Sequence, residues 1–178
     1  MNKAILSVLM ILMCSFLKAQ SSIYDFQLTA VDGTTINFND FRGKKILIVN
    51  TASHNTNEAD QLVELEQLYQ QFKDSGLVVI AIPSNDFDNE KKSNAQIKVN
   101  YHSNYNISFP ILAKASNKGN APSPLLKWLT KKNQNGRMDN HLKKDFQKFL
   151  INSNGTLIGV YTNWRPLSRV IVGAIRAN

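Results

Sequence analysis

Two apolar segments joined by an amphipathic one constrain the fold of this chain more than any other feature. The first runs from Ile46 to Val49, and the second, LVVIAI, runs from Leu77 to Ile82. Apolar runs of this length are typical of strands that are covered on both faces. The segment between them has apolar residues at helical spacing, namely Leu62, Leu65, Tyr69 and Phe72. We therefore expect a helix from about Glu58 to Asp74, ended by Gly76, and a right-handed parallel βαβ unit.

Two turn signals predict a hairpin on each side of this unit. YDFQLTAVDGTTINF alternates around Asp32-Gly33, and FQKFLINSNGTLIGVYT alternates around Asn154-Gly155. Asp-Gly and Asn-Gly pairs suit the positive φ angles of tight turns. The strands of the second hairpin are expected to extend the sheet, antiparallel to the first two strands.

The remaining elements complete an α/β architecture. We expect a short helix near Ala95 to Tyr101, a helix in APSPLLKWLTKK with proline in its first turn, and a last helix in PLSRVIVGAIRA. SFPILAK reads as a brief strand or an extended loop. This order predicts a thioredoxin-like fold: a mixed central sheet flanked by helices, with an N-terminal β-hairpin extension.

The first nineteen residues are expected to be a signal peptide, so that residues 20–178 form one exported domain. An apolar run from Ala4 to Leu17 follows an early lysine and is short for a membrane span. The mature protein is then periplasmic or secreted, with no stable insertion in a membrane. The alternative is a lipid anchor on Cys14, the only cysteine, although Met13 is large for the position before a lipidated cysteine.

Basic residues dominate one part of the chain. The formal net charge is +8, and between residues 127 and 148 seven basic residues face only Asp139 and Asp145: Lys127, Lys131, Lys132, Arg137, Lys143, Lys144 and Lys148. A basic surface attracts anions of any kind, but the sequence contains no nucleic-acid recognition motif. We interpret the seven as a solvated face and expect no nucleic-acid partner.

From Ser22 to Asn178 the sequence resembles the glutathione peroxidase family. The resemblance rests on SIYDFQLTAVDGTTINFNDFRGKKILIVNTAS, on LVELEQLYQQFKDSGLVVIAIPSNDF and on YNISFPILAK. SPLLKWL and DFQKFLINSNGTLIGVY continue it, in order and with the family's spacing. It implies a thioredoxin-like fold and peroxide reduction by a selenocysteine or cysteine.

The active-site positions that the resemblance implies are all replaced. Asn55 occupies the peroxidatic position, and Asp86 occupies that of the active-site glutamine. Lys144 and Asp145 occupy those of the tryptophan and the asparagine. The resolving cysteine of thioredoxin-linked members would fall near Tyr101. If the fold holds, we expect these positions to converge on one cleft, with Lys144 in salt-bridge reach of Asp86 or Asp145.

The replacements decide what the sequence predicts about function. An asparagine amide has no accessible anion near neutral pH and cannot form a sulfenic acid, so Asn55 cannot attack peroxide. The three histidines, His54, His102 and His141, lack metal-site spacing, so we expect neither a metal nor a cofactor. The prediction is a degenerate peroxidase whose former cleft holds a small anion or a protein partner. The alternative is a peroxidase acting by an unrecognised route or with a partner's thiol, so enzyme status stays open.

Overall fold

The computed structural model describes residues 22–53, 60–119 and 122–177. Its elements in chain order are η2 (Ile23–Asp25), β1 (Gln27–Thr29), β2 (Thr35–Asn37), η3 (Phe38–Phe41), β3 (Lys45–Thr51), α2 (Asp60–Phe72), η4 (Lys73–Ser75), β4 (Leu77–Pro83), α3 (Asn94–Tyr105), α4 (Pro124–Thr130), α5 (Lys132–Asn135), β5 (Lys148–Ile151), β6 (Leu157–Tyr161) and α6 (Arg169–Arg176). Within these residues, no helix has both the length and the apolar character needed to cross a bilayer.

The βαβ unit is confirmed. β3 and β4 pair in parallel, in register from Lys45 opposite Leu77 to Thr51 opposite Pro83. α2 connects the two strands and continues into η4, which ends at Gly76 in the left-handed conformation, with φ of 87°. Glycine adopts this backbone conformation without the steric cost that a Cβ atom brings.

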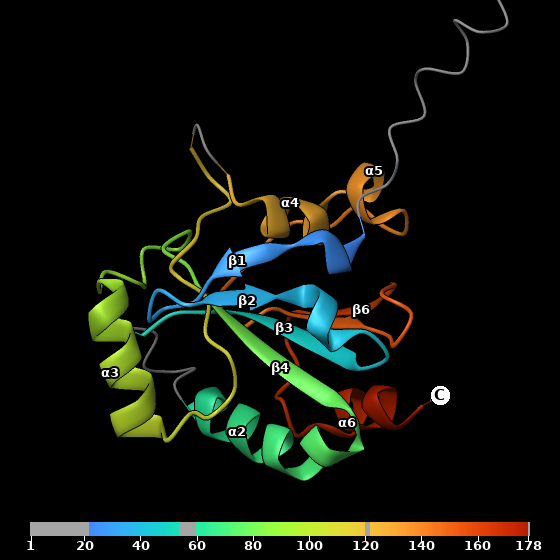
Figure 1. The fold of residues 1–178 in the computed structure, drawn as a ribbon, viewed down its shortest axis with the longest axis horizontal. Helices are drawn as coiled ribbons and strands as arrows, with labels where there is room; N and C mark the ends of the chain where they lie inside the picture. Colours follow the sequence, from blue (N-terminus) through green and yellow to red (C-terminus); the bar gives the residue numbers. More distant parts are fainter. Residues whose placement is uncertain (1–21, 54–59, 120–121, 178) are drawn as a thin grey trace, which may run out of the picture.

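The second hairpin extends the sheet as expected. The four-stranded sheet has the order β4-β3-β5-β6, and β5 is antiparallel both to β3 and to β6. The turn at Asn154-Gly155 joins β5 to β6, and Gly155 has φ of 79°. The sheet is therefore mixed, with a parallel pair at one edge and an antiparallel pair at the other (Figure 1).

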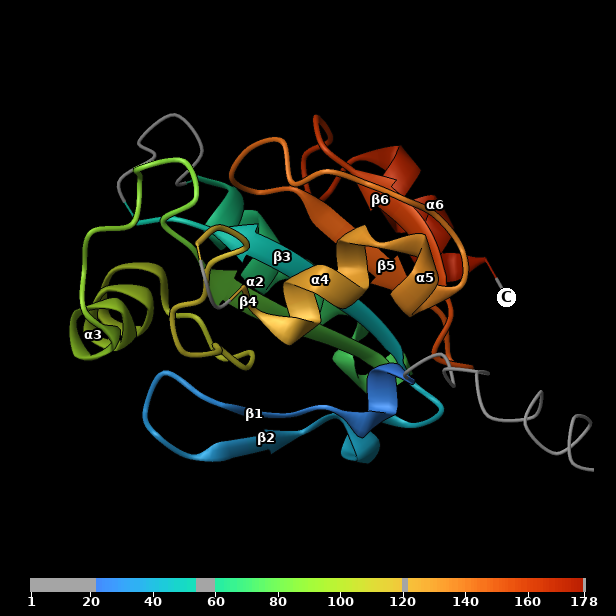
Figure 2. The ribbon, with the colours of Figure 1, turned by 90° about the horizontal axis from the view of Figure 1, so that it is seen from above.

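Each face of this sheet is covered by its own hydrophobic core. Leu47, Val49, Val79 and Leu150 pack on the side of α2, α3 and α6. The alternate strand residues, among them Ile48 and Phe149, pack with α4 on the opposite side. Figure 2 shows α4 and α5 lying over the face opposite α2 and α6. The two-residue alternation of side chains in a strand thus explains why β3 reads as a continuous apolar run.

The hairpin β1–β2 forms a separate two-stranded sheet, and an extended segment connects it to β4. Leu112 donates its N–H to the carbonyl of Ala81 at 2.9 Å, and Val31 donates to the carbonyl of Ile111 at 2.9 Å. SFPILAK is thus an extended segment with isolated bridges rather than a strand. It covers the edge of β4, which leaves that strand fully buried.

The structure corrects three details of the sequence interpretation. α3 continues beyond Tyr101 to Tyr105. The helix that begins at Pro124 ends at Thr130, because Lys131 is extended, with φ of −119° and ψ of 121°, and separates α4 from α5. Lys148 does not belong to a solvated face: it is fully buried, because its position in β5 points the side chain into the core beneath α2.

Candidate functional site

The turn after β3 leads to Asn55, which we expect at the family's peroxidatic position and which lies outside the described residues. The backbone around Asn50 fixes where this turn begins. Asn50 donates its N–H to the carbonyl of Gln147 at 3.0 Å, and its carbonyl accepts the N–H of Phe146 at 2.6 Å. The next residue, Thr51, accepts the N–H of Ser84 at 2.9 Å. The end of β3 is therefore held between the end of β4 and the approach to β5.

Asp86, at the glutamine position, is buried and hydrogen-bonded to a loop far away in sequence. Its carboxylate accepts the N–H of Asn117 at 2.8 and 3.1 Å and the hydroxyl of Ser116. Lys118, from the same loop, donates its ammonium to the backbone carbonyl of Asp86. Among the described residues, the carboxylate of Asp86 thus accepts its hydrogen bonds from the loop before α4, and not from Lys144, which was one of the two pairings that we expected.

Asp145, at the asparagine position, is buried and bound to the loop that follows β4. Its Oδ2 accepts the side-chain amide of Asn89 at 2.6 Å. The neighbouring Lys144 is partly exposed, and its carbonyl accepts the side-chain amide of Asn50 at 3.5 Å. The structure therefore brings together the loop after β4, which contains Asp86, the loop before β5, which contains Asp145, and the end of β3. The expected pairing of Lys144 with Asp145 stays a prediction.

Glu90 is a buried carboxylate that the sequence interpretation missed. It has no exposed surface, and its Oε2 accepts the N–H of Ser53 at 2.7 Å, just before the peroxidatic position. Its other oxygen accepts the N–H of Lys92 at 3.1 Å, and its own N–H binds the side chain of Asn85. Hydrogen bonds from backbone N–H groups stabilise a carboxylate in a buried place. Glu90 therefore ties the turn after β3 to the loop after β4.

Tyr101, near the position of the family's resolving cysteine, is buried against the same turn. Its hydroxyl faces Thr51 and Ser53, yet among the described residues these three hydroxyl groups have no hydrogen bond of ordinary geometry. Burial raises the pKa of Tyr101 well above its ordinary value, and the nearby carboxylate of Glu90 adds to this rise. The phenol therefore remains protonated and cannot act as an anionic nucleophile near neutral pH.

A buried lysine lies on the α2 side of the sheet. The ammonium of Lys148 donates to the side-chain oxygen of Gln61 at 2.5 Å and to the carbonyl of Phe146 at 2.6 Å. The sequence FQKFLI could have predicted the burial of Lys148. Side chains alternate between the two faces of a strand, so Lys148 shares a face with Leu150, which packs into the core beneath α2.

The described residues around the site offer acid, amide and hydroxyl groups but no redox centre. Residues 20–178 contain no cysteine. Among the described residues, no group of three or more histidine, cysteine or acidic side chains is placed to bind a metal ion. The arrangement can bind and order loops or a ligand, and it lacks a thiolate for peroxide.

Comparisons with known proteins agree with this architecture. The model of the glutathione peroxidase family matches residues 23–130. A glutathione peroxidase of Lactococcus lactis is 34% identical over 138 residues, which cover 77% of this chain and 87% of that protein. Some relatives are longer: the chain spans 61% of a chloroplastic phospholipid hydroperoxide glutathione peroxidase of Arabidopsis thaliana, at 33% identity.

Solved structures agree on the fold. The crystal structure of Trgpx in its apo form is 27% identical and superposes with a TM-score of 0.65, covering 89% of this chain and 98% of that one. A thioredoxin-family thiol:disulfide interchange protein of Chlorobium tepidum superposes with a TM-score of 0.64 at 18% identity, over 88% and 97% of the two chains. The second likeness shows the fold alone, and it agrees with a thioredoxin-like architecture.

Proposed function

The chain belongs to the glutathione peroxidase family, and we propose that it is a member without peroxidase chemistry, acting as an exported binding or accessory protein. The observation that carries this proposal is the absence of any cysteine from residues 20–178, together with asparagine at position 55. Peroxide reduction needs a nucleophile that attacks the O–O bond and accepts an oxygen atom, which a low-pKa thiolate does. An amide does neither.

The surroundings of two other replaced positions support the proposal. Asp86 and Asp145 are 3% and 1% exposed, and both carboxylates accept hydrogen bonds from neighbouring loops. A carboxylate bound in this way orders the protein and carries a charge where the family has a neutral amide. We therefore propose that Asp86 and Asp145 hold the surrounding loops in place and do not stabilise a reactive thiolate.

The proposed role is the binding of a small anion or a protein partner at the former cleft. Lys144 is partly exposed, and Lys118 is exposed although its ammonium binds the carbonyl of Asp86, so both place positive charge beside this region. Residues 1–19 have the pattern of a signal peptide, which supports action outside the cytoplasm. A lipid anchor on Cys14 is the less favoured form of the same export.

A second candidate function is peroxide reduction with a thiol supplied by a partner. The observation that favours it is the family relationship itself, since relatives with a third of their residues in common are named glutathione peroxidases. Shared fold and family membership predict an activity less reliably than the residues present at the site do.

A peroxide-consumption assay on residues 20–178 decides between the two. Hydrogen peroxide and an organic hydroperoxide are supplied with glutathione or with thioredoxin and its reductase, and a cysteine-containing family member is the positive control. We expect consumption no faster than in the absence of the protein. Turnover near that of the control would overturn the proposal.

Introducing a cysteine at position 55 tests whether this one change gives peroxidase activity or whether the other three positions must change as well. We expect Asn55→Cys alone to remain nearly inactive, because nearby carboxylates disfavour a thiolate. Activity should need the combined change with Asp86→Gln, Lys144→Trp and Asp145→Asn, provided that circular dichroism shows that variant to be folded. A family-like rate from Asn55→Cys alone would contradict this account of the site.

A further inference from the structure

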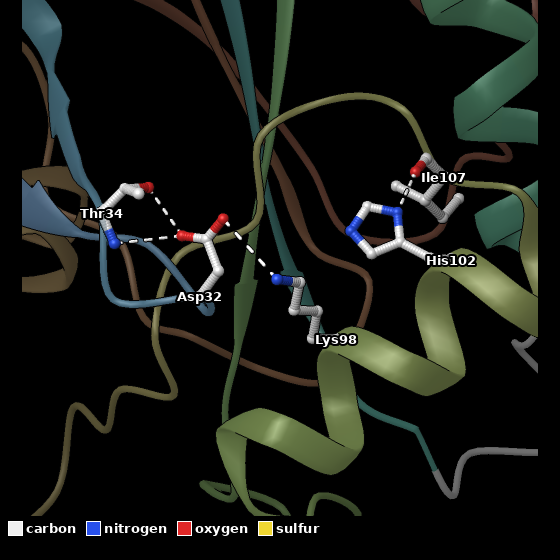
Figure 3. Close-up of polar contacts among 5 residues, drawn as sticks. All are labelled: Asp32, Thr34, Lys98, His102 and Ile107. Atoms are coloured by element: carbon white, nitrogen blue, oxygen red, sulfur yellow. Dashed lines mark hydrogen bonds and ion pairs between the residues drawn. The ribbon is translucent and has the colours of Figure 1, made fainter.

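A small hollow lies where the turn of the β1–β2 hairpin faces the C-terminal end of α3. Its volume is about 240 Å³, and the extended segment that follows α3 forms one wall. The walls carry the apolar side chains of Ile36, Phe109 and Ile111, while Asp32 and His102 line it as well. Figure 3 shows the polar residues around it. Of the expected active-site positions that the structure describes, Asp86, Lys144 and Asp145 do not line this hollow.

The two carboxylate oxygens of Asp32 differ in their partners: one accepts two hydrogen bonds, and the other has only a distant ion pair. Its Oδ1 accepts the N–H of Thr34 at 3.1 Å and the hydroxyl of Thr34 at 2.6 Å. These hydrogen bonds lower the pKa of Asp32 below its ordinary value, so the charge persists at neutral pH. Its Oδ2 lies 3.9 Å from the ammonium of Lys98, beyond hydrogen-bond distance, and both side chains are substantially exposed. A competing cation can therefore replace Lys98 at little cost.

His102 presents a hydrogen-bond acceptor toward the same place. Its Nδ1 lies 2.8 Å from the carbonyl oxygen of Ile107. Because a carbonyl only accepts, Nδ1 carries the hydrogen, and in the neutral ring the lone pair is on Nε2. Figure 3 shows this nitrogen on the side of the ring that faces Lys98 and Asp32.

The neighbouring hydroxyl groups are occupied and add no donor to the hollow. Ser108 donates its hydroxyl to the carboxylate of Glu66 at 2.6 Å, and Thr34 donates its hydroxyl to the carboxylate of Asp32. The hollow thus combines an apolar wall with a carboxylate oxygen and an imidazole nitrogen, both of which accept. This chemistry suits a ligand that donates hydrogen bonds and carries positive charge.

We propose that this hollow binds a small organic ammonium ion with an apolar body. The ammonium group takes the place of Lys98 beside Asp32 and donates to His102, while the hydrocarbon part packs on Ile36, Phe109 and Ile111. The proposal does not depend on whether the protein reduces peroxide, because it uses none of the former active-site positions.

Titration with phenethylamine, followed by the backbone amide NMR signals of residues 20–178, tests the proposal. At a pH of about 8 the amine is charged. We expect saturable shifts in residues 30–36 and 98–111, with a dissociation constant on the order of 1 mM for so small a ligand. The neutral 2-phenylethanol and the anionic 3-phenylpropanoate should bind at least about fivefold more weakly. Absence of saturable shifts, or equal binding of the three compounds, would overturn the proposal.

Two variants separate charge recognition from simple burial. Asp32→Asn keeps the Oδ1 acceptor for Thr34 and should weaken phenethylamine binding about five- to tenfold. Asp74→Asn, an equal charge change on the exposed turn after α2, is the control and should leave binding unchanged. Lys98→Gln removes the competing cation and should strengthen binding about two- to fivefold. Weaker phenethylamine binding in Lys98→Gln would mean that the ammonium does not take the place of Lys98 beside Asp32, and the proposal would be wrong.

Discussion

Replacing Asp86 by the family's glutamine should destabilise this protein rather than restore it. Asp86 is 3% exposed, and its carboxylate accepts both the hydroxyl of Ser116 and the N–H of Asn117. Glutamine carries its amide one methylene further from the backbone and has only one accepting atom. Asp86→Gln therefore moves the accepting oxygen away from Ser116 and Asn117, and its NH2 group places a donor where Oδ2 accepted the N–H of Asn117.

The magnitude follows from the bonds involved. A hydrogen bond to a charged group contributes about 1.5–3 kcal/mol, and removing the buried charge returns part of its desolvation cost. We expect Asp86→Gln to lower the free energy of unfolding by about 2–3 kcal/mol, which is roughly 5–10 °C in the thermal midpoint for a domain of this size. Asp86→Asn keeps the shape and one acceptor, so its loss should be about half as large.

Urea unfolding of residues 20–178, followed by circular dichroism, measures the effect, and hydrogen exchange at the amide of Asn117 locates it. Asp88→Asn is the matched control, because Asp88 is exposed two residues away and has φ of 61°, a conformation that asparagine tolerates. Unchanged stability and unchanged exchange at Asn117 in Asp86→Gln would refute the view that Asp86 anchors the loop before α4.

Three further predictions concern the turn after β3, the second hairpin and alkaline pH. Tyr101→Phe removes a buried hydroxyl that has no ordinary hydrogen bond among the described residues, so urea unfolding should show a change between zero and about 1 kcal/mol of added stability. Because burial raises the folded-state pKa of Tyr101, its protonated form stabilises the fold below pH of about 10. That stability is lost as pH rises further, and thermal melts should show a shallower alkaline decline in Tyr101→Phe than in the natural protein. Gly155→Ala should cost about 2–4 kcal/mol, because its Cβ would lie 2.6 Å from the ring of Tyr24 at φ of 79°. Gly33→Ala, with a similar φ of 88° and open space around it, should cost only about 1–2 kcal/mol in the same melts.

Local patterns decided much of the fold in advance. The apolar runs of β3 and β4, the helix spacing between them and the two turn glycines act through nearest neighbours in the chain, so they can be identified without coordinates. The family resemblance supplied the replaced positions in the same way, residue by residue. What it could not supply was how Asp86 and Asp145 are used.

Lys148 illustrates where reasoning from the sequence failed. Its neighbours in sequence suggest a solvated face, but strand alternation and α2 place it in the core. A residue's side of the sheet depends on strand pairing, which composition does not reveal.

The sequence by itself determined the order of the elements, the βαβ unit and both hairpins, because each depends on residues close together in the chain, and it shows that residues 20–178 contain no cysteine. Only the tertiary structure decided which partners the replaced residues have. Ser116 and Asn117 are some thirty residues from Asp86, Glu90 is 37 residues from Ser53, and Asn89 is 56 from Asp145. Hydrogen bonds across such separations form only after the sheet has brought three loops to one end, so no local pattern could predict them.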